Sequence, residues 1–169
     1  FERLHSHDLV RYMAARFPQL RHRILSECLA AQRRDFSAYN ARVFSRAWEA
    51  LEPTREEKLA AASDLIALLG AQPSPSVSLA QKSLLGIARE LTVEQVDALV
   101  RGSAQVLARS EKKLLRAHVR LLAALVKAHP GCAAAVSDVV GAAEFPLDLR
   151  DRAAALVAAP AGSGDSDGS

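Results

Sequence analysis

One stretch of the chain, residues 109–127, separates its cations from its apolar side chains in a way that only an α-helix can satisfy. At about 100° per residue, the cations fall within one stripe: Arg109, Lys112, Lys113, Arg116, Arg120 and Lys127. The opposite side carries Leu114, Leu115, Val119, Leu121, Leu122, Leu125 and Val126. Because such a helix must bury its apolar side against neighbours, the pattern predicts a fold of several packed helices.

The rest of the chain indicates more helices joined by short turns. Thr54 with Glu57, and Thr92 with Gln95, have the capping-box form, in which each side chain satisfies a free backbone donor at a helix start. Pro18 is placed to open another helix. No run of Val, Ile or aromatic residues alternates with period two, so no strand is predicted.

We therefore expect an all-α fold of about eight or nine antiparallel helices. Ser6, Asp35 and Ser110 are expected to cap the first helix, the third helix and the cationic helix. One helix is expected to run from Thr54 to Gly70, where the glycine ends it.

Apolar positions also recur at a spacing near 34 to 37 residues. Leu115 and Leu149 stand 34 positions apart, and Ala80 and Ala117 stand 37 apart. A period of this length built from helix pairs is typical of an α-solenoid, in which neighbouring pairs bury their apolar stripes against each other. The expected architecture is an α-α superhelix.

Several short motifs resemble those of HEAT-like repeat proteins, and in particular a bacterial HEAT-like family of unknown function. They are found between residues 54 and 157: Thr54-Arg-Glu-Glu-Lys-Leu, Ser76-Val77, Lys113-Leu-Leu-Arg116, Leu121-Leu122 and Ala128-His-Pro130. The resemblance implies a superhelical fold and a recognition role, and it carries over no catalytic residue. Residues 1–51 fit the repeat poorly and are expected to form an irregular N-terminal cap.

The chain is expected to hold one helical-repeat domain, residues 1–159, followed by a disordered tail or linker at 160–169. That last segment is small, polar and acidic, so it cannot bury enough apolar surface to order itself. No signal peptide is present, and no apolar run approaches the roughly 18 residues of a membrane span. Since the chain begins at Phe1, we expect a piece of a larger bacterial, cytoplasmic protein with no membrane association.

The sequence offers little for catalysis or metal binding. His5, His7 and Asp8 form the one cluster with the residue types of a metal site, but no further His or Cys stands at ligand spacing. They are interpreted as solvated capping residues, with a metal-dependent hydrolase as a remote alternative. His118 is expected in the core, bonded to a backbone carbonyl. We expect no enzyme and no cofactor.

Two thiols, Cys28 and Cys132, lie too far apart for a metal motif and are expected to be reduced and buried. Gly86 and Gly102 stand singly inside predicted helices, where they are expected to permit close helix contact.

The cationic stripe is the candidate partner-binding site. Three of its pairs place like charges four residues apart, which destabilises a helix by roughly 0.2–0.5 kcal/mol per pair. The stripe can be a solvated surface or be neutralised by acids of a neighbouring helix, such as Asp138 or Glu144. As a functional site it would bind an acidic protein surface or, alternatively, a DNA or RNA backbone. The formal net charge of only +3 favours a protein partner.

Overall fold

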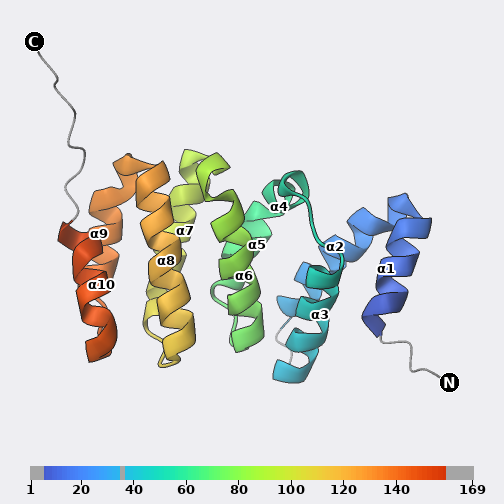
Figure 1. Cartoon of the computed structure of the whole chain (residues 1–169), viewed down its shortest axis with the longest axis horizontal. Helices are drawn as coiled ribbons and strands as arrows, with labels where there is room; N and C mark the ends of the chain where they lie inside the picture. Colours follow the sequence, from blue (N-terminus) through green and yellow to red (C-terminus); the bar gives the residue numbers. More distant parts are fainter. Residues whose placement is uncertain (1–5, 35–36, 159–169) are drawn as a thin grey trace, which may run out of the picture.

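The computed structural model describes residues 6–34 and 37–158, and within these every helix or strand element is a helix (Figure 1). The predicted all-α class is therefore confirmed. Ten α-helices and two short 3-10 helices follow one another. They are α1 (Ser6–Arg16), α2 (Pro18–Gln32), α3 (Ala38–Ala50), α4 (Arg55–Ala60), α5 (Ala62–Leu68), α6 (Ser74–Ile87), η1 (Ala88–Glu90), α7 (Val93–Leu107), α8 (Lys112–Ala128), η2 (Pro130–Cys132), α9 (Ala133–Gly141) and α10 (Leu147–Ala158).

One predicted helix is interrupted, and this raises the helix count above the expected number. The segment that opens at Thr54 breaks at Ala61, whose backbone angles of φ −94° and ψ 4° lie outside the α region. It therefore forms the two short helices α4 and α5 instead of one.

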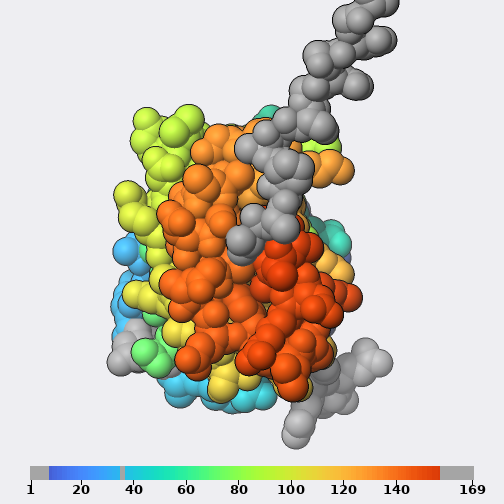
Figure 2. Space-filling view, turned by 90° about the vertical axis from the view of Figure 1, so that its left-hand side faces the viewer, coloured from blue at the N-terminus to red at the C-terminus, as the bar shows by residue number. Residues whose placement is uncertain are grey.

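The helices lie in two adjacent rows (Figure 1). In one row α1 packs on α3, α3 on α6, α6 on α8, and α8 on α10; in the other α2 packs on α5, α5 on α7, and α7 on α9. Helices that follow each other in the chain, such as α7 and α8, pack across the two rows. Figure 2 looks at the end of the array, where α9 and α10 lie side by side.

The core runs between the rows and is built mainly from leucine. The largest side chains with almost no exposed surface are Leu29, Leu65, Leu68, Leu69, Leu84, Ile87, Leu99, Leu107, Leu115, Leu121, Leu122 and Leu125. Burying each contributes about 1.5–3 kcal/mol relative to leaving it exposed. The apolar side predicted for α8 is buried as expected, with Val126 only partly covered.

Local capping follows the sequence at two helix starts. Thr54 Oγ1 accepts from the Glu57 backbone N–H at 3.1 Å, and the Thr54 N–H donates to Glu57 Oε1 at 3.0 Å. Thr92 and Gln95 form the same reciprocal pair at the start of α7. Both predicted capping boxes are confirmed.

Other predicted caps differ from the structure. α8 begins at Lys112 with Glu111 as its N-cap residue and no side-chain capping bond, so the assignment of Ser110 was wrong. Asp35 lies outside the described residues; Ser37 caps α3 by accepting from the Asn40 N–H at 3.4 Å. Ser6 is itself the first residue of α1.

Side chains link neighbouring helices by donating to backbone carbonyls near helix ends. Arg21 Nη2 donates to Leu51 O at 2.6 Å, and His129 Nε2 to Ala88 O at 2.8 Å. Because a carbonyl at a helix end lacks an intrahelical donor, these bonds complete its hydrogen bonding and tie the helices together. Among the described helices, none combines the length and apolar content needed to span a bilayer.

Candidate partner-binding surface

The cationic stripe predicted from the sequence divides into three groups in the structure. Arg109 does not belong to the helix, because α8 starts three residues later, at Lys112. Its guanidinium instead points back to the turn between α5 and α6, donating to Ala71 O at 3.1 Å and to Gln72 O at 2.9 Å. It also pairs with Glu111 at 2.7 Å, and its side chain is only 18% exposed. Arg109 thus links the α7–α8 connection to the α5–α6 turn, and the prediction that it lies on the cationic helix was wrong.

Two further cations of the stripe form ion pairs with a single acid of α10. Arg116 Nη2 donates to Asp148 Oδ2 at 2.8 Å, and Lys112 Nζ lies 3.7 Å from Asp148 Oδ1. The hydrogen bond from Arg116, aided by the charge of Lys112, lowers the pKa of Asp148. A neighbouring acid does neutralise part of the stripe, as one interpretation expected, but it is Asp148 and not Asp138 or Glu144.

Three cations remain exposed without an ion pair to any described residue: Lys113, Arg120 and Lys127. We refer to these three as the α8 cationic surface. Their directions around the helix axis differ by only about 40°, and they extend over about 21 Å along it. They therefore form a straight line of positive charge on the side of α8 opposite the core.

The exposed charges of the two rows differ in sign. On α3, α6, α8 and α10 the exposed cations are Arg42, Arg46, Lys82, Lys112, Lys113, Arg116, Arg120, Lys127, Arg150 and Arg152, and the exposed acids are Glu49, Asp148 and Asp151. On α2, α5, α7 and α9 the exposed acids are Glu27, Asp64, Glu94, Asp97 and Asp138, and the exposed cations are Arg23 and Arg101. The modest net charge thus conceals a strongly uneven distribution, with the α8 cationic surface on the positive row.

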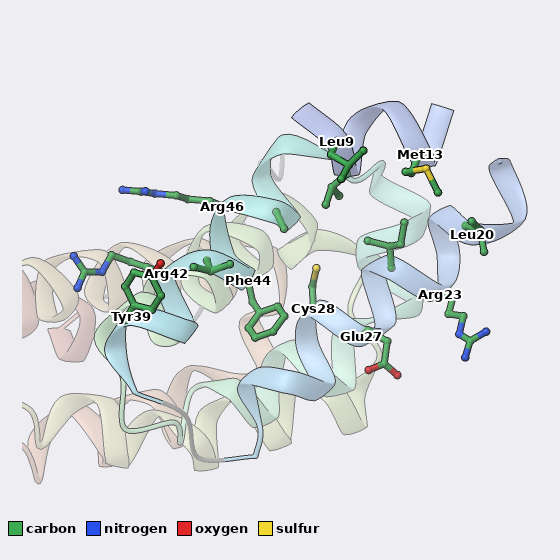
Figure 3. A pocket seen from close by; sticks show the side chains of 14 residues that line it. Leu9, Met13, Leu20, Arg23, Glu27, Cys28, Tyr39, Arg42, Phe44 and Arg46 are labelled. Atoms are coloured by element: carbon green, nitrogen blue, oxygen red, sulfur yellow. The ribbon is translucent and has the colours of Figure 1, made fainter. Parts of the chain in front are cut away.

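A second surface feature, which we call the N-terminal groove, lies between α1, α2 and α3 (Figure 3). It has a volume of about 1070 Å³. Its apolar lining consists of Leu9, Val10, Met13, Leu20, Ile24, Cys28, Tyr39, Val43, Phe44 and Ala47, and its charged lining of Arg23, Glu27, Arg42 and Arg46. The sequence pattern did not reveal this groove: Val43 has the spacing of a buried helix position, yet it is 39% exposed.

His118 lies in the core as expected, but its partners are two side chains and not the predicted backbone carbonyl. Its Nε2 is 2.8 Å from Ser103 Oγ and its Nδ1 is 3.2 Å from Gln81 Nε2. Ser103 uses its only proton to donate to Leu99 O, so the imidazole must donate from Nε2 and accept at Nδ1. Burial lowers the pKa of His118 to about 4, which keeps the ring neutral.

The cysteines are buried as predicted. Burial raises the pKa of Cys28 to about 11, and it also raises the pKa of Cys132. Low thiolate content makes both poor nucleophiles. His5 and the side chain of His7 lie outside the described part of the chain, while Asp8 is exposed. Within the described residues, no group of three or more His, Cys, Asp or Glu is arranged to hold a metal ion.

Comparison with known families gives one match. Residues 8–114 match the model of a family described as a domain of unknown function (DUF6493). The chain belongs to this family. No curated protein and no solved structure matches the chain.

The DUF6493 match includes one of the two surface features completely and the other only in part. The whole N-terminal groove, from Leu9 to Ala47, lies inside the matched residues. The match ends within the first turn of α8, so it includes Lys113 but not Arg120 or Lys127. Residues 8–51 of the segment expected to be an irregular cap therefore lie within the DUF6493 match.

Proposed function

We propose that this chain is a non-enzymatic, HEAT-like helical-repeat scaffold that binds an acidic protein surface through Lys113, Arg120 and Lys127. We further propose that it works as part of a larger bacterial protein in the cytoplasm. The observation that carries the binding role is the line of three exposed cations on α8 that have no ion pair with any described residue.

The repeat interpretation is supported by the arrangement of helices in two rows with pairs stacked on pairs. Leu115 of α8 and Leu149 of α10, which stand 34 positions apart, are both 1% exposed. Side-chain bonds between neighbouring pairs recur at similar separations, 38 residues for Arg109 to Ala71 and 41 for His129 to Ala88. Stacked helix pairs at similar separations along the chain are what the HEAT-like proposal requires.

A protein partner fits the α8 cationic surface better than a duplex does. Strong backbone binding to DNA uses six to ten phosphate contacts, roughly, whereas α8 offers three unpaired cations. Asp148 sits beside Lys112 and Arg116 at the start of the helix, where it would repel phosphates. A folded protein can place its carboxylates opposite Lys113, Arg120 and Lys127 alone and leave Asp148 unopposed, whereas the phosphates of a duplex continue along the whole helix.

The alternative is a solenoid that binds the DNA or RNA backbone, and one observation favours it. Exposed cations continue along the same row, with Lys82 on α6 and Arg42 and Arg46 on α3. An extended nucleic acid could follow this row. Phosphate contacts of this kind would give binding without sequence preference.

Two anionic probes separate these functions. A 16-residue glutamate-rich peptide and a 20-base-pair duplex are titrated against the chain by fluorescence anisotropy, at about 50 mM and about 200 mM salt. The proposal expects peptide binding and no duplex binding at the lower salt. Tight duplex binding with a steep salt dependence would replace the proposal with its alternative.

Charge reversal then locates the site. The double variant Arg120→Glu and Lys127→Glu should weaken peptide binding roughly tenfold, because two attractions become repulsions worth about 0.2–1 kcal/mol each. The matched control, Arg89→Glu with Arg101→Glu, makes the same change in net charge at exposed cations of η1 and α7, outside the α8 cationic surface. Equal loss in both variants would show that total charge, and not the α8 cationic surface, determines binding.

A further inference from the structure

The N-terminal groove is a second surface feature, separate from α8 and independent of the function proposed above. We propose that it receives the apolar side of an acidic amphipathic helix from a partner protein. Three features of the groove lead to this partner: its exposed apolar lining, its uncompensated arginines and its length.

The lining leaves large apolar side chains in contact with solvent. Leu9 of α1 is 56% exposed, and Tyr39 and Val43 of α3 are 69% and 39% exposed. Large apolar residues gathered around one hollow mark an interaction site more often than single exposed ones do. The apolar side of a partner helix that bound between α1 and α3 would remove this surface from water.

The charge at the edge of the groove is positive. Arg42 and Arg46 extend from α3 on one side and Arg23 from α2 on the other (Figure 3). None of the three forms an ion pair with a described residue. The acid of the lining, Glu27, already pairs with Arg34 at 3.6 Å. The groove therefore has unpaired cations for acidic residues that flank an apolar stripe.

The dimensions match a short helix. From Tyr39 to Ala47 the lining of α3 extends over about 12 Å, which is slightly more than two helical turns. That length accepts apolar anchors at positions i, i+4 and i+7 of a bound helix. Because the groove is formed by three helices with satisfied backbones, it offers no strand edge, and a further helix is the element that can pack there.

Two other occupants fit less well. The chain's own residues 160–169 contain acids but no large apolar side chain, so they cannot fill the lining. A second copy of the chain would form a self-complementary interface, in which the same patch faces itself. That arrangement would bring Arg42 and Arg46 of one copy toward the arginines of the other.

The test uses the full 169-residue chain and a displayed library of 16-residue helical peptides. Each peptide carries Leu, Ile or Phe at i, i+4 and i+7, and the flanking positions vary among Asp, Glu, Lys, Arg and Ala. Selection is expected to enrich peptides with Asp or Glu at the flanks. Failure to enrich any peptide, or enrichment of basic or uncharged flanks, would overturn the proposal.

Variants of exposed groove residues then map the site with an enriched peptide. Val43→Asp should abolish binding, and Arg42→Glu with Arg46→Glu should weaken it roughly tenfold. The α8 double variant Arg120→Glu and Lys127→Glu should keep binding within about twofold, because its changes lie outside the groove. Circular dichroism confirms that each variant folds.

Three results would contradict the groove as the site. Binding that survives Val43→Asp in a folded protein would place the peptide elsewhere. Sedimentation equilibrium that shows a dimer of the wild-type chain, dissociated by Val43→Asp, would assign the groove to a second copy. A loss of peptide binding in the α8 variant alone would move the site to α8 while leaving the scaffold function intact.

Discussion

The buried histidine of α8 makes the stability of this domain depend on pH in a way that can be calculated. His118 has no exposed surface, and its hydrogen bonds require a neutral ring that donates from Nε2 and accepts at Nδ1. Protonation would add a second N–H that points at the amide N–H of Gln81. Rotating the Gln81 amide by half a turn would offer its oxygen to the imidazole. The same rotation would remove the hydrogen bond that Gln81 Nε2 now donates to Leu114 O at 2.9 Å. The folded state therefore resists the imidazolium.

The magnitude follows from the two pKa values. In the unfolded chain His118 takes up its proton near pH 6.5, whereas in the folded chain it does so only near pH 4. A base with a lowered folded pKa stabilises the fold fully above the unfolded value and loses this contribution as the pH falls toward the folded value. The loss from neutral pH down to pH 4 is about 3 kcal/mol, at about 1.4 kcal/mol per pKa unit.

The assay compares the wild type with His118→Gln, which cannot titrate but keeps a donor for Ser103. Urea unfolding of both proteins from pH 7.5 to pH 4 gives the free energy of unfolding at each step. The wild type should lose about 3 kcal/mol more than the variant over this range. Carboxylates with lowered pKa values, such as Glu57 and Asp148, also stabilise the fold less as the pH falls, but they do so equally in both proteins. The difference between the two unfolding free energies therefore reports His118 alone.

One result would refute this reasoning directly. Nitrogen NMR of the imidazole should report a neutral ring protonated at Nε2 down to about pH 5, since the folded pKa is about 4. A folded His118 that titrates near pH 6.5, or parallel stability curves for wild type and His118→Gln, would show that the network with Gln81 and Ser103 does not exclude the proton.

Three further predictions concern other sites. Arg109→Ala should lower the free energy of unfolding by about 1–2 kcal/mol, because Ala71 O loses its donor, while glutamate-peptide binding stays unchanged; a stable variant that no longer binds would contradict its structural role. Gly102→Ala should raise the free energy of unfolding by about 0.5–1 kcal/mol, because alanine favours the helix more than glycine does. The new Cβ would meet Leu69 Cδ1 at an ordinary 3.9 Å, so a fall in melting temperature would contradict this prediction. At pH 8 the thiol of Cys28, with its pKa raised to about 11, should be alkylated by iodoacetamide at least tenfold more slowly in the folded chain than in urea, and equal rates by mass spectrometry would count against its burial.

Features determined by a few adjacent residues could be predicted from the sequence. The capping boxes at Thr54 and Thr92 were found because each needs only two side chains three positions apart. Pro18 opens α2 as predicted, because proline suits the first turn of a helix and no later one. The buried side of α8 was found because a period of 3.6 residues is visible in the order of the letters.

Features that depend on how helix pairs are offset could not be predicted. The sequence places Arg109 in the same stripe as Arg116. In the structure, however, Arg109 donates to the carbonyl of Ala71, 38 residues earlier, and Arg116 donates to the carboxylate of Asp148, 32 residues later. The pattern shows which residues share a side of a helix, but not which atoms of another helix lie opposite. For the same reason the partners of His118 were missed.

The N-terminal groove was missed for a different reason. Leu9, Met13 and Val43 have the spacing of buried helix positions, and periodicity cannot distinguish a side that is covered from one that is left open. The excess of arginine in the same region was visible, but without the fold its position at the edge of a groove could not be known.

The side-chain bonds between successive helix pairs have a consequence for how the molecule comes apart. Helices contact mainly helices close to them in sequence, and the carbonyls bonded across pairs, Ala71 O and Ala88 O, lie 38 and 41 residues from their donors. An end pair can therefore detach by breaking a single interface, while an inner pair must break two. Amide hydrogens at both ends should exchange before those of α6 and α7, and thermal unfolding should spread inward from the ends.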